Sequence, residues 1–238
     1  MYRKTFTDST ENGKQLLPSI QSLVNEQRKV MQTIHEINHI VSGTLRIGTF
    51  TSVSVNWLPH IIRQFSERYP NVHFELLAGD YNEITERIRC GKIDCGFLTA
   101  PVADELFFQT LYRDPMMVVL PANHPLTSKT ALTFEDIKEE PFIMPMKGSD
   151  QDIRSITDKN IKKLDVRYTL NDDFSVISLV NHGFGITIMP ELILKNFKPN
   201  VVSIPFIPQQ YRKIGIATLP HMSILTKTFV KFLTEDRT

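Results

Sequence analysis

The feature that most constrains the fold is a heptad stripe in the first part of the chain. Its positions follow one another at alternating steps of four and three residues, and all but one are apolar: Leu16, Ile20, Leu23, Gln27, Val30, Ile34, Ile37 and Val41. This spacing is typical of a coiled coil, in which a single polar residue fixes the register at a cost in stability. Because a helix with one narrow apolar stripe needs a partner to bury it, residues 10–43 are predicted to form a helix that assembles a homodimer or homotetramer.

Composition excludes several classes of protein. With 41% hydrophobic and 22% charged residues among 238, the chain is typical of a globular protein, and its formal net charge of +1 does not indicate a nucleic-acid or membrane surface. No apolar run reaches the ~18 residues of a membrane-spanning helix, and no apolar segment follows the basic start as in a signal peptide. Two cysteines, Cys90 and Cys95, favour a reducing compartment, so we expect a cytoplasmic protein without a disulfide framework.

After Gly43, strand and helix patterns alternate. Strands are predicted at 44–50, 72–76 and 93–98, and two helical stripes lie between them, which indicates a parallel sheet covered by helices. Further strands are predicted at 116–120, 142–144, 166–170, 185–190 and 214–219. Two α/β halves follow, subdomain I over about 44–119 and 220–238 and subdomain II over about 120–219. Small ligands bind in the cleft between such halves, at the carboxyl ends of strands.

Four blocks of residues carry a family resemblance. In chain order they are Gly43-x-Leu45-Arg46-Ile47-Gly48 with Leu58-Pro59, Phe65 and Tyr69-Pro70-x-Val72; Gly91-x-Ile93-Asp94-Cys95-Gly96; His124-Pro125-Leu126; and Val180-x-x-Gly183-x-Gly185-Ile186-x-x-Met189-Pro190. Over residues 44–238 these blocks resemble the effector-binding domain of LysR-type transcriptional regulators. Thr10-x-x-Gly13-x-x-Leu16-Leu17 resembles the start of the linker helix through which that family dimerises.

The resemblance implies a two-subdomain, periplasmic-binding-protein-like α/β domain preceded by a long dimerisation helix. A DNA-binding winged helix is then expected before residue 10, with residues 1–9 as a remnant of its wing, where Arg3 and Lys4 contact only the DNA backbone. The expected function is to sense a small metabolite and to pass the signal to DNA through the dimer. The alternatives are a transport-type solute-binding protein of the same fold and, with less support, an enzyme, although no acid–base or nucleophile pair indicates catalysis.

Polar residues at strand ends are candidates for the effector site. Free backbone N–H groups and two hydroxyls after the first strand suit a carboxylate or phosphate, and the resemblance makes Ser52 the best match. The full candidate set is Thr51, Ser52, Asp80, Thr99, Lys147, Ser149, Asp173 and Phe174. The alternative interpretation is that Ser52, Asp80 and Asp173 cap helices. An acidic Asp80 would repel an anionic effector unless helix capping engages it fully.

Two motifs that suggest chemistry have simpler interpretations. His35-Glu36-x-x-His39 matches the zinc-metallopeptidase pattern, but the heptad places these side chains opposite the apolar stripe, where they face solvent. Cys90 and Cys95 are interpreted as small apolar residues and not as a redox pair, because no basic cluster lies beside them. We therefore expect no bound metal and no cofactor.

Overall fold

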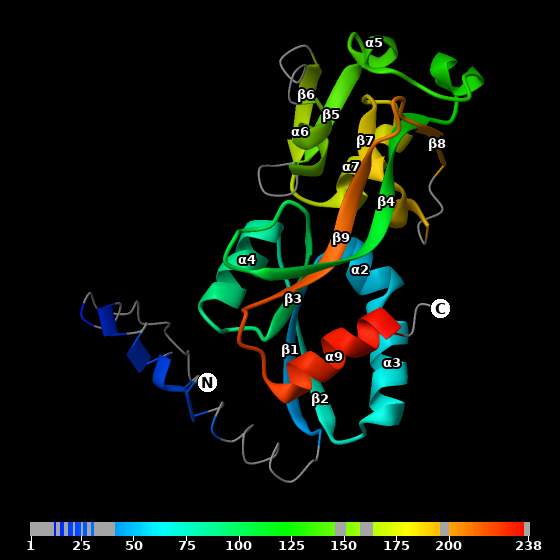
Figure 1. The fold of residues 1–238 in the computed structure, drawn as a ribbon. Coiled ribbons are helices and arrows are strands. Elements are labelled where there is room, and N and C mark those ends of the chain that lie inside the picture. The colour runs from blue at the N-terminus through cyan, green and yellow to red at the C-terminus, as the bar shows by residue number, and fades with distance from the viewer. Residues whose placement is uncertain are drawn as a thin grey trace, which may run out of the picture.

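The protein is described here by a computed structural model. It describes residues 41–145, 151–157, 164–195 and 200–235, together with residues 12, 15–16, 19–20, 22–24, 26–27 and 30 (Figure 1). Figure 1 shows two lobes joined by a pair of long strands, with the last helix lying against the first lobe.

The first lobe is a parallel sheet with covering helices. Its elements are β1 (Gly43–Thr49), α2 (Thr51–Asn56), α3 (Leu58–Arg68), β2 (Val72–Ala78), α4 (Tyr81–Arg89) and β3 (Cys95–Thr99). β1 pairs in parallel with β2 and with β3, which confirms the predicted β-α-β-α-β run. The sheet can lie close to α4 because Gly96 has no side chain: a Cβ there would stand 2.5 Å from Ile84 Cγ2.

Two long strands connect the lobes. β4 (Phe107–Pro121) and β9 (Tyr211–Thr218) pair antiparallel from Phe107–Thr218 to Pro115–Tyr211, with an irregularity in register between Thr110 and Tyr112. β9 also pairs antiparallel with β3, and the far end of β4 pairs with β7 (Thr187–Pro190) and β8 (Val201–Pro205). The resulting strand order is β2-β1-β3-β9-β4-β7, with β8 also on β4, so the sheet is mixed and curls from one lobe into the other.

The second lobe has its own core. Its remaining elements are η1 (Pro125–Ser128), α5 (Phe134–Ile137), β5 (Pro141–Pro145), α6 (Gln151–Thr157), β6 (Asp165–Leu170), α7 (Asp173–Asn181) and α8 (Glu191–Leu194), and β5 pairs in parallel with β6. Met116, Phe142 and Ile188 are buried within this core. The chain returns to the first lobe as α9 (Ile224–Glu235), beside α3 in Figure 1, where Phe229 and Phe232 pack edge-to-face on Phe65.

Local signals in the sequence account for several helix ends. The Asp80 carboxylate accepts from the backbone N–H of Glu83 at 2.8 Å, and the Glu83 carboxylate accepts from the backbone N–H of Asp80. The predicted capping box of α4 is therefore confirmed. Asp172, not Asp173, caps α7. Cys90 follows α4 at the surface, whereas Cys95 is buried in β3, and both are free thiols. Burial raises the pKa of the Cys95 thiol, as expected of an inert apolar residue.

The heptad stripe is described only in part. Its described members before residue 31 are helical and exposed: Leu16, Ile20, Leu23, Gln27 and Val30. Val41 is not helical, and it packs against the first core. Ile34 and Ile37 lie outside the described residues, as do His35, Glu36 and His39. The dimerisation helix therefore stays a prediction. Within the described segments, no helix combines the length and apolar character needed to cross a bilayer.

Candidate functional site

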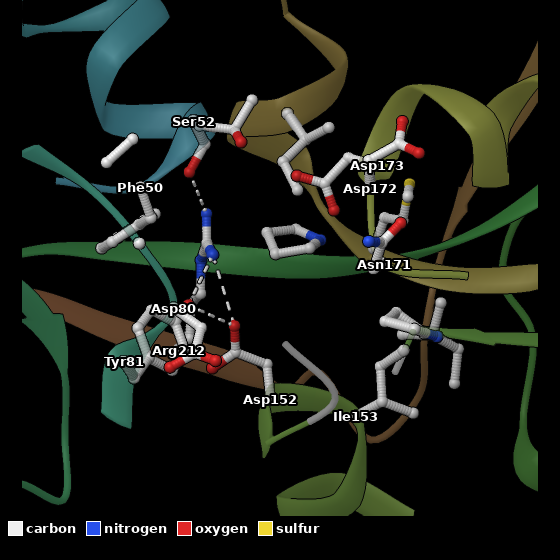
Figure 2. A pocket seen from close by; sticks show the side chains of 18 of the residues that line it. Phe50, Ser52, Asp80, Tyr81, Asp152, Ile153, Asn171, Asp172, Asp173 and Arg212 are labelled. Atoms are coloured by element: carbon white, nitrogen blue, oxygen red, sulfur yellow. Dashed lines mark hydrogen bonds and ion pairs between the residues drawn. The ribbon is translucent and has the colours of Figure 1, made fainter. Parts of the chain in front are cut away.

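A cavity of about 420 Å³ lies between the two lobes. It begins at the carboxyl ends of β1 and β2, where parallel strands of such sheets present their ligand sites. The first lobe contributes Phe50, Thr51, Ser52, Ala78, Gly79, Asp80, Tyr81 and Glu83. The rest of the wall is Pro145, Asp152, Ile153, Asn171, Asp172, Asp173, Ile188, Met189, Pro190, Ile193 and Arg212. Figure 2 shows Ser52, Tyr81 and Arg212 on one side and Asn171, Asp172 and Asp173 on the other.

Arg212 on β9 is the central charge of this site. Its guanidinium donates to Asp114 Oδ2 from Nε at 2.9 Å and from Nη2 at 2.7 Å. Nη2 also donates to Ser52 Oγ at 2.7 Å, and Nη1 donates to the Tyr81 hydroxyl at 3.0 Å. Arg212 is only 6% exposed and Asp114 is fully buried, so this is a desolvated ion pair. Such pairs persist in proteins when further hydrogen bonds satisfy both partners.

Asp152 on α6 connects the second lobe to this arginine. One of its oxygens, Oδ2, lies 3.3 Å from Arg212 Nη1 and accepts from the Tyr81 hydroxyl at 2.8 Å. The other, Oδ1, accepts from the Thr99 hydroxyl at 3.3 Å. We call Ser52, Tyr81, Thr99, Asp114, Asp152 and Arg212 the Arg212 cluster. It joins α2, α4, β3, β4, α6 and β9, and therefore links both lobes and both connecting strands at one point. Figure 2 shows its members Ser52, Tyr81, Asp152 and Arg212.

Asp114 and Asn56 add a second link between the lobes. Asp114 Oδ1 accepts from the backbone N–H of Leu192 at 3.0 Å, which fixes the start of α8. The Asn56 amide on α2 donates to the Leu192 carbonyl at 2.9 Å. Leu192 of α8 is thus hydrogen-bonded both to the connecting strand β4 and to α2 of the first lobe.

Burial and charge change the acid–base properties of the site. Burial raises the pKa of Tyr81, and the neighbouring Asp152 raises it further, so this hydroxyl stays protonated and donates to the carboxylate. Burial also raises the pKa of Asp114, although Arg212 opposes that shift. The pKa of Asp173 is likewise raised by burial. The pKa of Asp172 is lowered, because its carboxylate accepts from Ser175 at the start of α7.

The predicted site residues divide into four groups. Thr51, Ser52, Asp80 and Asp173 all line the cavity. Thr99 lines a smaller cavity of about 220 Å³ that shares Tyr81 with the main one, and its hydroxyl contacts Asp152 and Tyr81 of the main site. Phe174 is exposed and is not part of the cavity wall. Lys147 and Ser149 lie outside the described residues. Ser52 caps no helix, because its hydroxyl bonds to Arg212.

Four members of the Arg212 cluster were not predicted from the sequence: Tyr81, Asp114, Asp152 and Arg212. Asp114 and Arg212 each lie just before the start of a predicted apolar strand, and their pairing across 98 positions has no local signature. A weak signal did exist: a charged residue beside a buried strand needs a partner of opposite sign. Asp152 and Tyr81 had no comparable signal. Among the described residues, no group of His, Cys, Asp and Glu side chains is arranged to hold a metal ion.

Comparison with known proteins identifies the family. The family model described as the LysR substrate binding domain matches residues 39–237. The chain is 30% identical over 230 residues to YvbU, an HTH-type transcriptional regulator of Bacillus subtilis, covering 95% of this chain and 78% of that protein. It is 28% identical over 214 residues to GltC, a transcriptional dual regulator of the same organism, covering 87% of this chain and 71% of GltC.

Solved structures agree on the fold. The regulatory domain of CcmR from Synechocystis PCC6803, in complex with 2-PG, aligns with a TM-score of 0.74 at 22% identity over 81% of this chain and 96% of that one. The effector-binding domain of BenM with its effector benzoate aligns with a TM-score of 0.70 at 23% identity, covering 80% and 90% of the two chains. The predicted α/β effector-domain fold and the family are therefore confirmed, and these relatives are regulators, not enzymes. The chain belongs to the LysR family of transcriptional regulators and carries the effector-binding domain of that family.

Proposed function

We propose that this regulator senses a small molecule in the cavity between its lobes. The observation that carries the proposal is the cavity itself, which has walls from both lobes and one buried polar cluster that links them. A ligand that contacts both walls favours whichever arrangement of the lobes makes those contacts. We propose Thr51, Asp80 and Asp173 as residues that contact it, with Ser52 and Thr99 acting through the Arg212 cluster. Contacts from Lys147, Ser149 and Phe174 remain predictions.

We propose two subdomains, about 44–119 with 220–238 and about 120–219. Separate hydrophobic cores in the two lobes support this division, while β9 contributes Ile214 and Ile216 to the first core. We also propose that the helix predicted from residue 10 dimerises through the part of the heptad stripe before Val41, which itself packs on the first core, so that a change in the lobes alters the spacing of the DNA-binding parts. We propose a cytoplasmic location because the family acts in transcription, and the expectation of no cofactor stays a prediction.

A ligand screen by thermal shift tests the effector site. A molecule that binds only the folded protein must raise its melting temperature. The best blocking substitution is Thr51→Trp, because Thr51 is exposed and lines the cavity, whereas Ser52 is buried against Arg212. Thr130→Trp is the matched control, since Thr130 is exposed in the loop before α5. We expect hits to stabilise the parent and Thr130→Trp but not Thr51→Trp. Hits that stabilise all three proteins equally would place the site elsewhere.

A further inference from the structure

The described wall of the cavity is strongly acidic. Its positive charge comes from Arg212, whereas its carboxyl groups are those of Asp80, Glu83, Asp152, Asp172 and Asp173. Three of the five are used in helix starts: Asp80 and Glu83 form the capping box of α4, and Asp172 caps α7. The other two, Asp152 and Asp173, lie on the second-lobe side of the cavity.

Arg212 has no donor left for a ligand. A guanidinium carries five N–H donors. Asp114 takes one from Nε and one from Nη2, Ser52 takes one from Nη2, and Tyr81 and Asp152 share Nη1. The carboxylates of Asp114 and Asp152 outweigh the single positive charge of Arg212, so these three groups together carry a net charge of −1. An additional anion would therefore be repelled. A ligand carboxylate could reach Arg212 only by replacing one of these partners.

Asp152 stands where such a carboxylate would bind. It accepts from Tyr81, Thr99 and Arg212, which are the donors that would hold an incoming anion, and it is the only partner of Arg212 in this cluster that comes from the second lobe. Asp152 is 9% exposed and lines the cavity. Its own carboxylate therefore occupies the position that the carboxylate of a ligand would take.

We propose that Asp152 determines ligand specificity, by occupying the anion position at Arg212 and so selecting a ligand that carries an ammonium group over one that carries a carboxylate. The proposal deepens the proposed function, because it concerns the ligand class of the same cavity. The carboxyl groups of Asp152 and Asp173 line the cavity as hydrogen-bond acceptors, and the Asp173 carboxyl has no hydrogen bond to another described residue. The proposed ligand is thus positively charged at this position, whereas the free N–H groups after the first strand suggest a negatively charged one.

The test compares two flexible five-carbon probes of opposite charge, cadaverine and glutarate, at equal ionic strength. We expect cadaverine to raise the melting temperature of the parent protein and glutarate to leave it unchanged. Asp152→Ala frees the donors of Tyr81, Thr99 and Arg212, so its preference should reverse. Because a hydrogen bond to a charged group contributes about 1.5–3 kcal/mol, the apparent affinity for glutarate should rise at least about tenfold. Asp152→Asn keeps the shape of the side chain and should reduce the preference for cadaverine.

Glu67→Gln is the control for net charge, since Glu67 is exposed on α3 and should leave both responses as in the parent. The parent comparison needs no substitution, so a variant that fails to fold does not block the test. Stabilisation of the parent by glutarate as large as that by cadaverine would overturn the proposal. So would an unchanged preference in folded Asp152→Ala, or the absence of any response to either probe. These outcomes leave the Thr51→Trp ligand screen, and with it the proposed function, intact.

Discussion

Removal of the Arg212 charge should destabilise the fold strongly. In Arg212→Met the apolar stem is retained, but Asp114, which is fully buried, loses both hydrogen bonds from the guanidinium and keeps the Leu192 N–H. Asp152 keeps the Tyr81 and Thr99 hydroxyls. Most of the cost therefore arises at Asp114. Removing one partner of a buried ion pair typically costs about 3–5 kcal/mol, and we expect a loss of that size in the free energy of unfolding at pH 7.

The loss should depend on pH. Asp114 already has a raised pKa in the folded protein, above its ordinary value of 3.8, because it is buried. Without Arg212 that pKa should rise further, so the folded variant binds a proton that the unfolded chain has released. An acid of this kind stabilises the fold below its unfolded-state pKa and loses that contribution as the pH rises through its folded-state pKa. The variant should therefore regain stability relative to the parent between pH 7 and pH 5.

Urea unfolding at both pH values is the measurement. Asp114→Asn combined with Arg212→Met should recover about 2 kcal/mol of the loss, since no buried charge is then left without its partner. Arg167→Met is the control, because its ion pair with Asp165 is exposed and its loss should leave stability nearly unchanged. A loss below about 1 kcal/mol for Arg212→Met, or an equal loss at the two pH values, would refute this account of the cluster.

Three further results are expected. Ile20→Asp combined with Ile34→Asp should yield monomers, because each charge would enter a desolvated coiled-coil core; an unchanged mass in sedimentation would exclude dimerisation through the heptad stripe. Gly215→Ala should cost about 1–3 kcal/mol in urea unfolding, since its Cβ would stand 2.3 Å from the Gln109 carbonyl oxygen on β4. Asp80→Ala should cost about 1 kcal/mol by removing the cap of α4, and a neutral effect would mean that the capping box contributes little.

Much of the fold could be predicted because its signals are local. The capping box at Asp80 and Glu83, the helix end at His182 and Gly183, and the buried run from Met116 all appear within a few residues of sequence. The first part of β4, before Met116, was missed, since residues 107–115 carry apolar and polar side chains in pairs, without the strict alternation typical of a strand, and pair with the distant β9. Pairing between strands about 100 residues apart leaves no pattern in a short window.

The candidate site shows the same limit. Ser52 and Asp80 were found because they end strands of a recognisable sheet, and both line the cavity. The buried ion pairs of the Arg212 cluster depend on Asp114, Asp152 and Arg212, which come from three separate elements. Their contacts are set by how two lobes meet, so no spacing in the sequence encodes them. The expectation of a carboxylate ligand rests on the strand ends of the first lobe, and it stays a prediction that the two-probe comparison tests.

The paired strands β4 and β9 have a mechanical consequence. Both connections between the lobes are part of one hydrogen-bonded ribbon, and neither is a flexible loop. A hinge motion that separates the lobes would break the hydrogen bonds between residues 110–113 of β4 and their partners on β9. A change of twist along the ribbon would keep these bonds. Two-stranded ribbons tolerate a wide range of twist. We therefore expect a ligand that contacts both walls of the cavity to rotate one lobe about the axis of this ribbon.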